Sequence, residues 1–155
     1  MSALAIGDDI PACTLADADG AAIDLKALKG APLVVYFYPK ADTPGCTTEA
    51  QDFTRLAPDF AHLNAQVIAV SRDAPAKLCK FRDKYGLTVR LASDEDGSVC
   101  EAFGIWVEKQ NYGRTYMGIE RSTFLFGADG KLAREWRKVR VKGHADAVLE
   151  AAKTL

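Results

Sequence analysis

The sequence predicts an α/β domain with a central mixed β-sheet that is flanked by helices and preceded by a β-hairpin. Three observations support this fold class. The near-continuous apolar runs at 33–38 and 66–71 are typical of buried strands. Segments with helical spacing of apolar residues lie between the strands. A Gly-Ala-Asp-Gly turn between 121–126 and 131–139 indicates a second hairpin. At 155 residues, we expect one domain, residues 1–155.

The first half of the chain supplies the N-terminal hairpin, two buried strands and the helix that joins them. These elements are expected at residues 13–15 with 22–25, at 33–38, at 66–71 and at 47–63. Pro58 lies inside the helical segment and predicts a kink or break there. The strands that contain Val34 and Ile68 should pair in parallel, because a right-handed crossover through the intervening helix permits it.

The second half of the chain predicts a helix at 76–85, which begins after Pro75 and ends at Gly86. A short strand, a short helix, the second hairpin and a final helix follow. They are expected at residues 89–92, 98–103, 121–126 with 131–139, and 144–153. Residues 104–120 receive no helix or strand in this prediction.

Composition and charge exclude several function classes. The formal net charge of −1 gives no reason to expect a nucleic acid or an anionic membrane as partner. The apolar run at 31–38 is too short to span a bilayer. The first nine residues carry neither a basic region nor an apolar core, so no signal peptide is expected. We therefore expect a soluble cytoplasmic protein.

Four widely spaced cysteines are the most informative residues of the chain: Cys13, Cys46, Cys79 and Cys100. No two of them form a C-x-x-C pair, and no histidine lies at the spacing of a zinc site. A permanent disulfide framework is disfavoured in a reducing compartment. Any function of these thiols is therefore expected to come from their reactivity.

Cys46 is the best candidate for a reactive thiol. Only the thiolate attacks electrophiles, and a free thiol is largely protonated at neutral pH, so the anion needs stabilisation. Cys46 is predicted in the first turn of a helix that begins near Gly45, where unpaired amides and the helix dipole favour negative charge. The Thr43 hydroxyl could reach the sulfur or a bound oxygen, and Pro39 and Pro44 stiffen the loop. The alternative is a buried structural cysteine.

The motif Pro39-x-x-x-Thr43-x-x-Cys46 resembles the active-site signature of the peroxiredoxins. The longer string Phe-Tyr-Pro-Lys-Ala-Asp-Thr-Pro-Gly-Cys-Thr-Thr-Glu is similar to the Q-type subgroup, also called bacterioferritin comigratory proteins. The likeness extends over nearly the whole chain. It includes the segments 71–73, 84–87, 101–104, 112–116 and 118–124. The resemblance implies a thioredoxin-like fold.

The resemblance also implies roles for individual residues. Cys46 would be the peroxidatic nucleophile, which attacks a peroxide oxygen and becomes a sulfenic acid. Thr43 would hydrogen-bond the peroxide, Pro39 would shield the site from bulk water, and Arg121 would stabilise the thiolate and the leaving oxygen. Taken alone, Arg121 would be interpreted as an ordinary surface arginine of a strand, and only the resemblance assigns it to the site. Glu49, one turn after Cys46, orients the loop or Arg121, or is a solvated carboxylate.

The residue that resolves the sulfenic acid is less well defined. Part of the subgroup carries a second cysteine five residues after the first, where this chain has Gln51. Cys79 is the natural candidate, although the family position lies near Arg82, which shares its helix face. The alternative is that Cys79 is a partly buried helix residue. Cys100 is expected in the core, and the remaining cysteine, at position 13, is expected to be inert. Without a second thiol, an external thiol would attack the sulfenic acid.

The leading hypothesis is a thiol-specific peroxidase that reduces hydrogen peroxide and organic hydroperoxides. The resemblance implies recycling by thioredoxin or a glutaredoxin-like thiol donor, no cofactor or metal, and a monomer or weak dimer. One alternative is a peroxide sensor or relay that passes its oxidation to partner proteins. Another is a thioredoxin-like binding module without turnover. His62 and His144 lack a catalytic partner in the sequence, and Trp106 is expected to pack or to rim the site.

Overall fold

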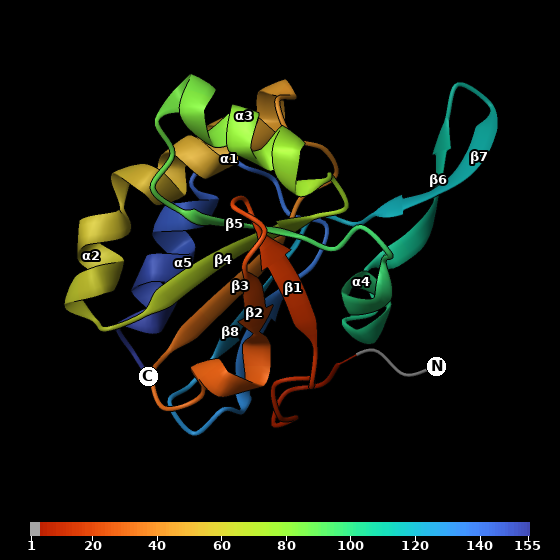
Figure 1. Cartoon of the computed structure of the whole chain (residues 1–155). Helices are drawn as coiled ribbons and strands as arrows, with labels where there is room; N and C mark the ends of the chain where they lie inside the picture. The colour runs from red at the N-terminus through yellow and green to blue at the C-terminus, as the bar shows by residue number, and fades with distance from the viewer. Residues whose placement is uncertain (1–3) are drawn as a thin grey trace.

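The computed structural model describes residues 4–155, and a seven-stranded mixed sheet forms its centre (Figure 1). The first three residues, where no signal peptide is predicted, lie outside the described residues. The order of strands in the sheet is β2-β1-β5-β4-β3-β8-β9. Their bounds are β1 Thr14–Asp17, β2 Ala22–Asp24, β3 Leu33–Phe37, β4 Gln66–Ser71, β5 Arg90–Ser93, β8 Ser122–Phe126 and β9 Leu132–Trp136. The predicted α/β class with a mixed sheet and an N-terminal hairpin is confirmed.

The two apolar runs of the first half form adjacent central strands. All five residues of β3 are buried, as expected for a strand covered on both faces. β3 pairs in parallel with β4, with Val35 opposite Ile68, and in antiparallel with β8 on its other side. This confirms the predicted crossover. It also places the loop after β3 beside the end of β4 and the start of β8.

Helices cover one face of the sheet. Their bounds are α1 Pro44–Arg55, α2 Ala57–His62, α3 Pro75–Tyr85 and α5 His144–Ala152. These helices pack on alternate β3 residues such as Val34 and Tyr36. The opposite face packs against the N-terminal segment, the short helix η1 (Leu25–Leu28) and α4 (Ser98–Ala102). The alternation of β3 residues therefore supplies two separate apolar layers.

Helix boundaries follow the sequence signals with two shifts. The segment predicted as 47–63 divides at Leu56, two residues before Pro58, into α1 and α2. α1 begins at Pro44, earlier than predicted, because proline fits the first position of a helix. α3 ends as predicted at Gly86, whose φ of 61° suits a glycine cap.

A projecting hairpin was not predicted. β6 (Trp106–Asn111) and β7 (Arg114–Ile119) form a separate two-stranded sheet that extends away from the body of the protein (Figure 1). Its turn holds Tyr112 and Gly113 at φ values of 52° and 76°, as a tight hairpin turn requires. Most of its side chains are exposed, so the strands lack the alternation of apolar and polar residues that predicts a half-buried strand.

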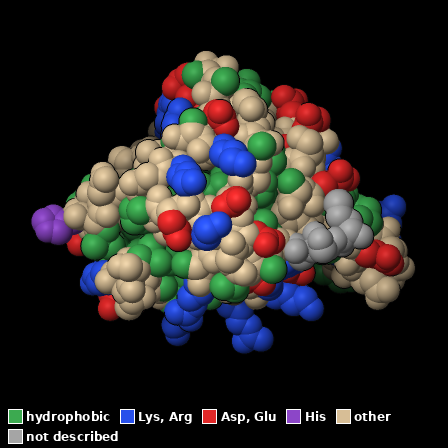
Figure 2. Space-filling model, turned by 90° about the horizontal axis from the view of Figure 1, so that it is seen from below, with side chains coloured by type: hydrophobic (Ala, Val, Ile, Leu, Met, Phe, Trp, Pro, Cys, Tyr) green, Lys and Arg blue, Asp and Glu red, His purple; other side chains and the backbone are tan. Residues whose placement is uncertain are grey.

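The surface carries charges of both signs. On the face shown in Figure 2, lysine and arginine side chains are interspersed with aspartate, glutamate and uncharged groups. This mixture agrees with the formal net charge of −1. Within residues 4–155, no helix combines the length and the apolar character that crossing a membrane requires.

Candidate active site

Cys46 lies in the first turn of α1, directly after the loop that leaves the buried end of β3. Thr43 is the N-cap residue of this helix, and its backbone is extended before the helix begins. First-turn amides have no carbonyl partner within the helix and point toward groups at its N-terminus. The Cys46 side chain is only 2% exposed. The predicted helix start is therefore present, and the thiol lies beneath the protein surface.

Strand pairing brings Arg121 to this helix start. Ser122, the first residue of β8, lies opposite Phe37, the last residue of β3, so Arg121 stands next to the loop that carries Cys46. Its Nη2 donates to Cys46 Sγ over 3.3 Å. The two residues named from the resemblance, 75 positions apart in sequence, are thus in contact.

Glu49 holds the other side of the guanidinium. Arg121 Nη1 donates to Glu49 Oε1 over 2.7 Å, and the carboxyl side chain is 1% exposed. Burial raises the pKa of Glu49 to about 7, although the charge and hydrogen bond of Arg121 oppose the shift. Of the alternatives left open by the sequence, the structure supports the one in which Glu49 orients Arg121. The solvated carboxylate is wrong.

Thr43 is oriented by the backbone of its own loop. Its hydroxyl donates to the carbonyl oxygen of Lys40 over 2.8 Å. The hydroxyl proton is therefore donated to Lys40 and not to the sulfur of Cys46, which was one of the two partners considered from the sequence. The oxygen keeps its lone pairs, so it can accept a hydrogen bond from the O–H of a hydroperoxide.

Pro39 is exposed, in the loop between β3 and α1. It borders a depression of about 550 Å³ whose other wall is formed by the β6–β7 hairpin, including Trp106, Tyr116 and Met117. Trp106 is half-buried, and Arg72 stacks over its ring at 4.5 Å. Trp106 thus both packs and rims the depression, as the two expectations for it proposed.

Two acidic residues that the sequence did not single out as functional fix the loop before Cys46. Asp73 Oδ2 accepts from the backbone N–H of Ala41 over 2.7 Å. Asp42, whose φ is 62°, accepts from the Tyr85 hydroxyl over 2.6 Å and from Lys84 over 2.9 Å. Position 73 lies in one of the blocks that carry the family resemblance, and positions 84 and 85 lie in another. The family resemblance in those blocks was the sequence signal that could have identified the residues that fix the loop.

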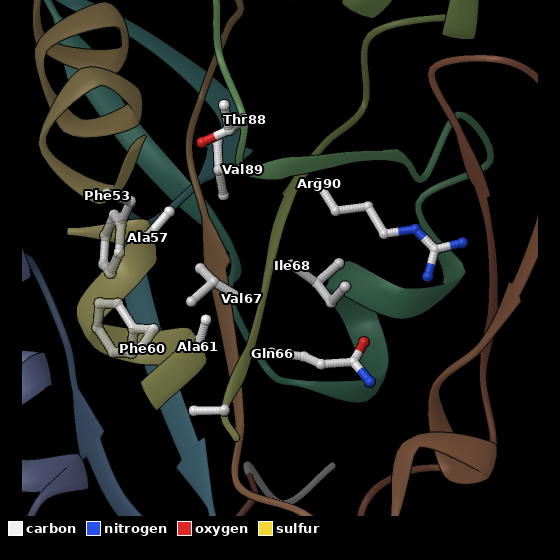
Figure 3. Close-up of a pocket in the computed structure, with 11 residues that line it drawn as sticks. Phe53, Ala57, Phe60, Ala61, Gln66, Val67, Ile68, Thr88, Val89 and Arg90 are labelled. Carbon is white, nitrogen blue, oxygen red and sulfur yellow. The ribbon is translucent and has the colours of Figure 1, made fainter. Parts of the chain in front are cut away.

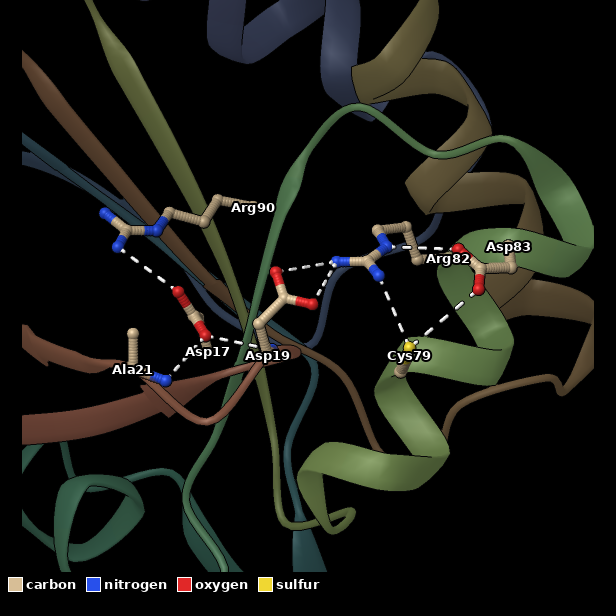
Figure 4. A network of polar contacts seen from close by, with 7 residues as sticks. All are labelled: Asp17, Asp19, Ala21, Cys79, Arg82, Asp83 and Arg90. Atoms are coloured by element: carbon tan, nitrogen blue, oxygen red, sulfur yellow. Dashed lines mark hydrogen bonds and ion pairs between the residues drawn. The ribbon is translucent and has the colours of Figure 1, made fainter.

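Cys79 lies on α3 in a charged network (Figure 4). Its sulfur accepts from Arg82 Nη2 over 3.3 Å, and the same guanidinium bonds to Asp19 over 3.1 Å and to Asp83 over 3.2 Å. Cys79 is half-buried, and all four cysteines are free thiols. The network joins α3 to the turn between β1 and β2.

The other two cysteines pack in the core of the second apolar layer. Cys100 is fully buried, and its backbone N–H donates to Asp94 over 2.7 Å. Cys13 is half-buried at the edge of the same cluster. Burial raises the pKa of both thiols, which disfavours the reactive thiolate. This agrees with the core position expected for Cys100 and with the inertness expected for Cys13.

His144 has a partner that its sequence context did not indicate. It begins α5, is buried, and its Nε2 lies 2.7 Å from the Thr123 hydroxyl. Burial and, to a lesser degree, the charge of Arg121 lower its pKa to about 4. His144 is therefore neutral near neutral pH. The signal was available only in the tertiary fold, because Thr123 comes from β8.

A smaller cavity of about 190 Å³ lies away from these groups, between α2 and the strands β4 and β5 (Figure 3). Phe53, Phe60, Val67 and Val89 form its apolar wall. Its lining contains no cysteine, carboxylate or histidine. The depression beside Pro39 is the better candidate for a substrate entrance, because its lining includes Pro39 and Lys40 from the loop that leads to Cys46.

An α/β fold with a cysteine at a helix N-terminus beside an arginine places the protein in the class of thiol-dependent redox proteins. The model of the AhpC/TSA family matches residues 6–135. Peroxiredoxin Bcp of Bacillus subtilis is 45% identical over 150 residues, which cover 97% of this chain and 96% of that protein. Peroxiredoxin Bcp of Escherichia coli is 42% identical over 96% of each chain.

Solved structures give the same assignment. Xanthomonas campestris bacterioferritin comigratory protein, described for its alkyl peroxide reduction activity, is 44% identical, with a TM-score of 0.89 over 97% of this chain and 96% of that one. A Xylella fastidiosa PrxQ variant gives a TM-score of 0.93 at 39% identity, over 99% and 98% of the chains. The chain belongs to the AhpC/TSA family, in its Bcp or Q-type peroxiredoxin branch. The predicted resemblance, thioredoxin-like fold and thiol peroxidase class are confirmed.

Proposed function

We propose that the protein reduces hydrogen peroxide and organic hydroperoxides with Cys46 as the nucleophile. The observation that carries this assignment is the guanidinium of Arg121, which donates at once to Cys46 Sγ and to the buried Glu49. A permanent cation fixed in this way favours the thiolate before the peroxide arrives. It also needs no reorganisation when negative charge develops on the leaving oxygen.

Each residue of the motif has a distinct part in this reaction. The Cys46 thiolate attacks one peroxide oxygen, the O–O bond breaks, and the sulfur becomes a sulfenic acid. Thr43, whose proton is engaged by Lys40, accepts a hydrogen bond from the peroxide and orients it. The first-turn backbone amides of α1 stabilise the attacked oxygen. Pro39 limits the access of water from the side of the depression.

The lining of the depression favours organic hydroperoxides as well as hydrogen peroxide. Trp106, Met117 and Ile119 supply apolar surface, and Lys40 and Lys109 supply basic groups. An alkyl group can lie on this surface while its hydroperoxide faces Cys46. The alkyl peroxide reduction reported for the Xanthomonas campestris relative supports the same substrate class.

We propose Cys79 as the resolving residue. Two different cysteine-to-serine variants of Xanthomonas campestris peroxiredoxin Q have been solved, and the two cysteines lie 36 positions apart in that chain. Counted without a gap, the same interval from Cys46 leads to Arg82, one turn after Cys79 on the same face of α3. A Cys46–Cys79 disulfide needs Cα atoms within about 7 Å. Local opening of the helix ends would supply that approach.

Turnover then requires an external reductant. A dithiol protein such as thioredoxin, or a glutaredoxin-like donor, would reduce the disulfide in the cytoplasm, where we place this protein as a monomer or weak dimer. Turnover with thioredoxin, thioredoxin reductase and NADPH separates a peroxidase from a sensor that oxidises a partner protein. A sensor would consume peroxide only as fast as that partner is supplied.

Mass spectrometry after one equivalent of peroxide tests the proposed path. The parent protein should lose two hydrogens and yield a peptide that joins Cys46 to Cys79. Cys79→Ser should instead gain one oxygen on Cys46, and Cys100→Ser, the matched control, should behave as the parent. A stable sulfenic acid in the parent would contradict the two-cysteine path. An unmodified Cys46 would contradict the peroxidase itself.

A further inference from the structure

Glu49 has one carboxyl oxygen that the contact with Arg121 does not satisfy. Oε1 accepts from Arg121, whereas Oε2 is buried and has no hydrogen-bond partner among the described residues. The hydroxyl of Tyr36 is likewise buried and unpartnered. An ionised carboxylate with an unpaired oxygen in a buried position is costly, and protonation of that oxygen removes most of the cost.

The charges around Arg121 do not balance if both of its acidic partners are ionised. Arg121 is one cation, and its two terminal nitrogens hold Cys46 and Glu49. With a thiolate and a carboxylate together, the buried group would carry an excess negative charge. With one proton shared between them, it is neutral. The neutral arrangement is favoured where charges are desolvated.

The other ionisable groups near Glu49 do not restore the balance. Asp52, on the same helix, adds negative charge and raises the pKa of Glu49. From β6, Lys109 approaches the site, and burial and the charge of Arg121 lower its pKa, but the ion pair of Glu49 is made with Arg121. His144 from α5 is neutral, because burial lowers its pKa to about 4. Burial raises the pKa of Tyr36 on β3, so it stays protonated.

We propose that Cys46 and Glu49 share one proton around Arg121, and that Glu49 gives this proton to the oxygen released from the hydroperoxide. This inference rests on the proposed peroxidase function of Cys46. The two acids are three residues apart on α1 and therefore lie on one face of the helix.

The step balances without another reactant. A lone pair of the Cys46 thiolate forms the S–O bond, and the electrons of the O–O bond pass to the leaving oxygen. The sulfur is oxidised and the peroxide is reduced. The leaving alkoxide or hydroxide takes the proton of Glu49 and departs as alcohol or water. The negative charge moves from the sulfur to the carboxylate, and both stay beside Arg121, so the site needs little electrostatic reorganisation.

Proton uptake during the first oxidation tests this proposal. The background is Cys79→Ser, so that the product is the sulfenic acid. A pH indicator in weak buffer reports uptake about one unit above the pKa of Glu49, where the carboxylate stays ionised after it has given up its proton. Glu49→Gln in this background should take up one proton more per Cys46 oxidised than its parent, because the solvent must supply it. Asp52→Asn, which removes a nearby half-buried carboxylate, should match the parent. Equal uptake in the parent and Glu49→Gln would overturn the proposal.

Infrared difference spectra provide a second readout that does not depend on the variant folding. At this same pH, the reduced parent should show the C=O stretch of a protonated carboxyl group, and this band should vanish when peroxide oxidises Cys46. If the band persists while the thiol is consumed, the proposed proton sharing is contradicted but the peroxidase function is not. A thiol that is not consumed contradicts the peroxidase function. We expect Glu49→Gln to slow the first oxidation roughly 10²-fold, as for the loss of a general acid.

Discussion

Two cysteines of this protein contact an arginine at the same distance, yet their surroundings differ. Arg121 Nη2 lies 3.3 Å from Cys46 Sγ, and Arg82 Nη2 lies 3.3 Å from Cys79 Sγ. Cys46 is in the first turn of α1, where the helix N-terminus favours an anion. Cys79 lies within α3, away from that end. The contact with arginine alone therefore does not distinguish the two thiols.

The second partners of the two arginines make the difference sharper. Arg121 shares its charge with Glu49, which is 1% exposed. Arg82 shares its charge with Asp19 and Asp83, both of them 69% exposed. The buried charges around Arg121 balance only if Cys46 and Glu49 hold one proton between them. The charges around Arg82 are exposed, so water screens them. A thiolate at position 46 is supported by its surroundings, and one at position 79 competes with two nearby carboxylates.

Replacing each cysteine in turn should give the largest contrast. Cys46→Ser removes the nucleophile, and we expect peroxide consumption to fall by roughly 10³-fold or more. Cys79→Ser should leave the first oxidation unchanged and impair only turnover. Stopped-flow measurement of peroxide consumption compares them. If Cys79→Ser slows the first step as much as Cys46→Ser, the proposed division of roles is wrong.

Replacing each arginine should give the next largest effect. Arg121→Ala removes the charge that stabilises the thiolate and the leaving oxygen, so the first oxidation should slow roughly 10²-fold. It also leaves Glu49 buried without a partner, which should lower the free energy of unfolding by about 3 kcal/mol. Arg82→Ala should cost under about 1 kcal/mol, because its carboxylate partners are exposed. Urea unfolding that gives equal losses would contradict the contrast.

The stability of the buried group should depend on pH. Glu49 has a folded pKa raised from 4.5 to about 7, so the folded state binds its proton more tightly than the unfolded state. Its contribution to the free energy of unfolding should therefore fall as pH rises from about 4.5 to about 7, by up to about 1.4 kcal/mol per unit. His144, with a pKa lowered from 6.5 to about 4, acts in the opposite direction.

Subtracting the pH profile of Glu49→Gln from that of the parent isolates Glu49 from His144. Denaturant unfolding at a series of pH values measures both profiles. The difference should decline across this window and be flat above it. A flat difference throughout would show that Glu49 is ionised as readily in the folded as in the unfolded protein.

The smallest effect is expected at the exposed network. Asp19→Asn breaks the ion pair between the β1–β2 turn and α3, and we expect the free energy of unfolding to fall by about 0.5 kcal/mol. The first oxidation of Cys46 should not change. Thermal unfolding at low and high salt measures the contribution of this ion pair to stability, which salt should reduce by screening. A loss as large as that of Arg121→Ala would mean that the network is not solvent-screened.

Much of the fold was readable from the chain because its strands and helices have strong local signals. Pro75 and Gly86 bound α3, and the apolar runs at 33–38 and 66–71 become adjacent parallel strands. The β6–β7 hairpin escaped prediction because its exposed strands have no apolar period. The residues of its turn were a local signal, but a turn signal predicts a hairpin only where strand patterns flank it.

The candidate site was predictable only in part. The spacing of Thr43 and Cys46 and the helix start are local features. Arg121 was named through the family resemblance, since no local pattern brings it to Cys46. The burial of Glu49 and the partner of His144 depend on how α1, β8 and α5 pack together. Such contacts follow from tertiary packing and have no counterpart in local sequence.

The most direct test of this account is the order in which the four thiols react. The reduced protein is treated with less than one equivalent of hydroperoxide, the sulfenic acid is trapped chemically, and each cysteine peptide is quantified by mass spectrometry. We predict that Cys46 alone carries the first oxidation and that Cys79 changes only afterwards. Oxidation of Cys79 as fast as Cys46, or a Cys46 that stays reduced while peroxide is consumed, would contradict it.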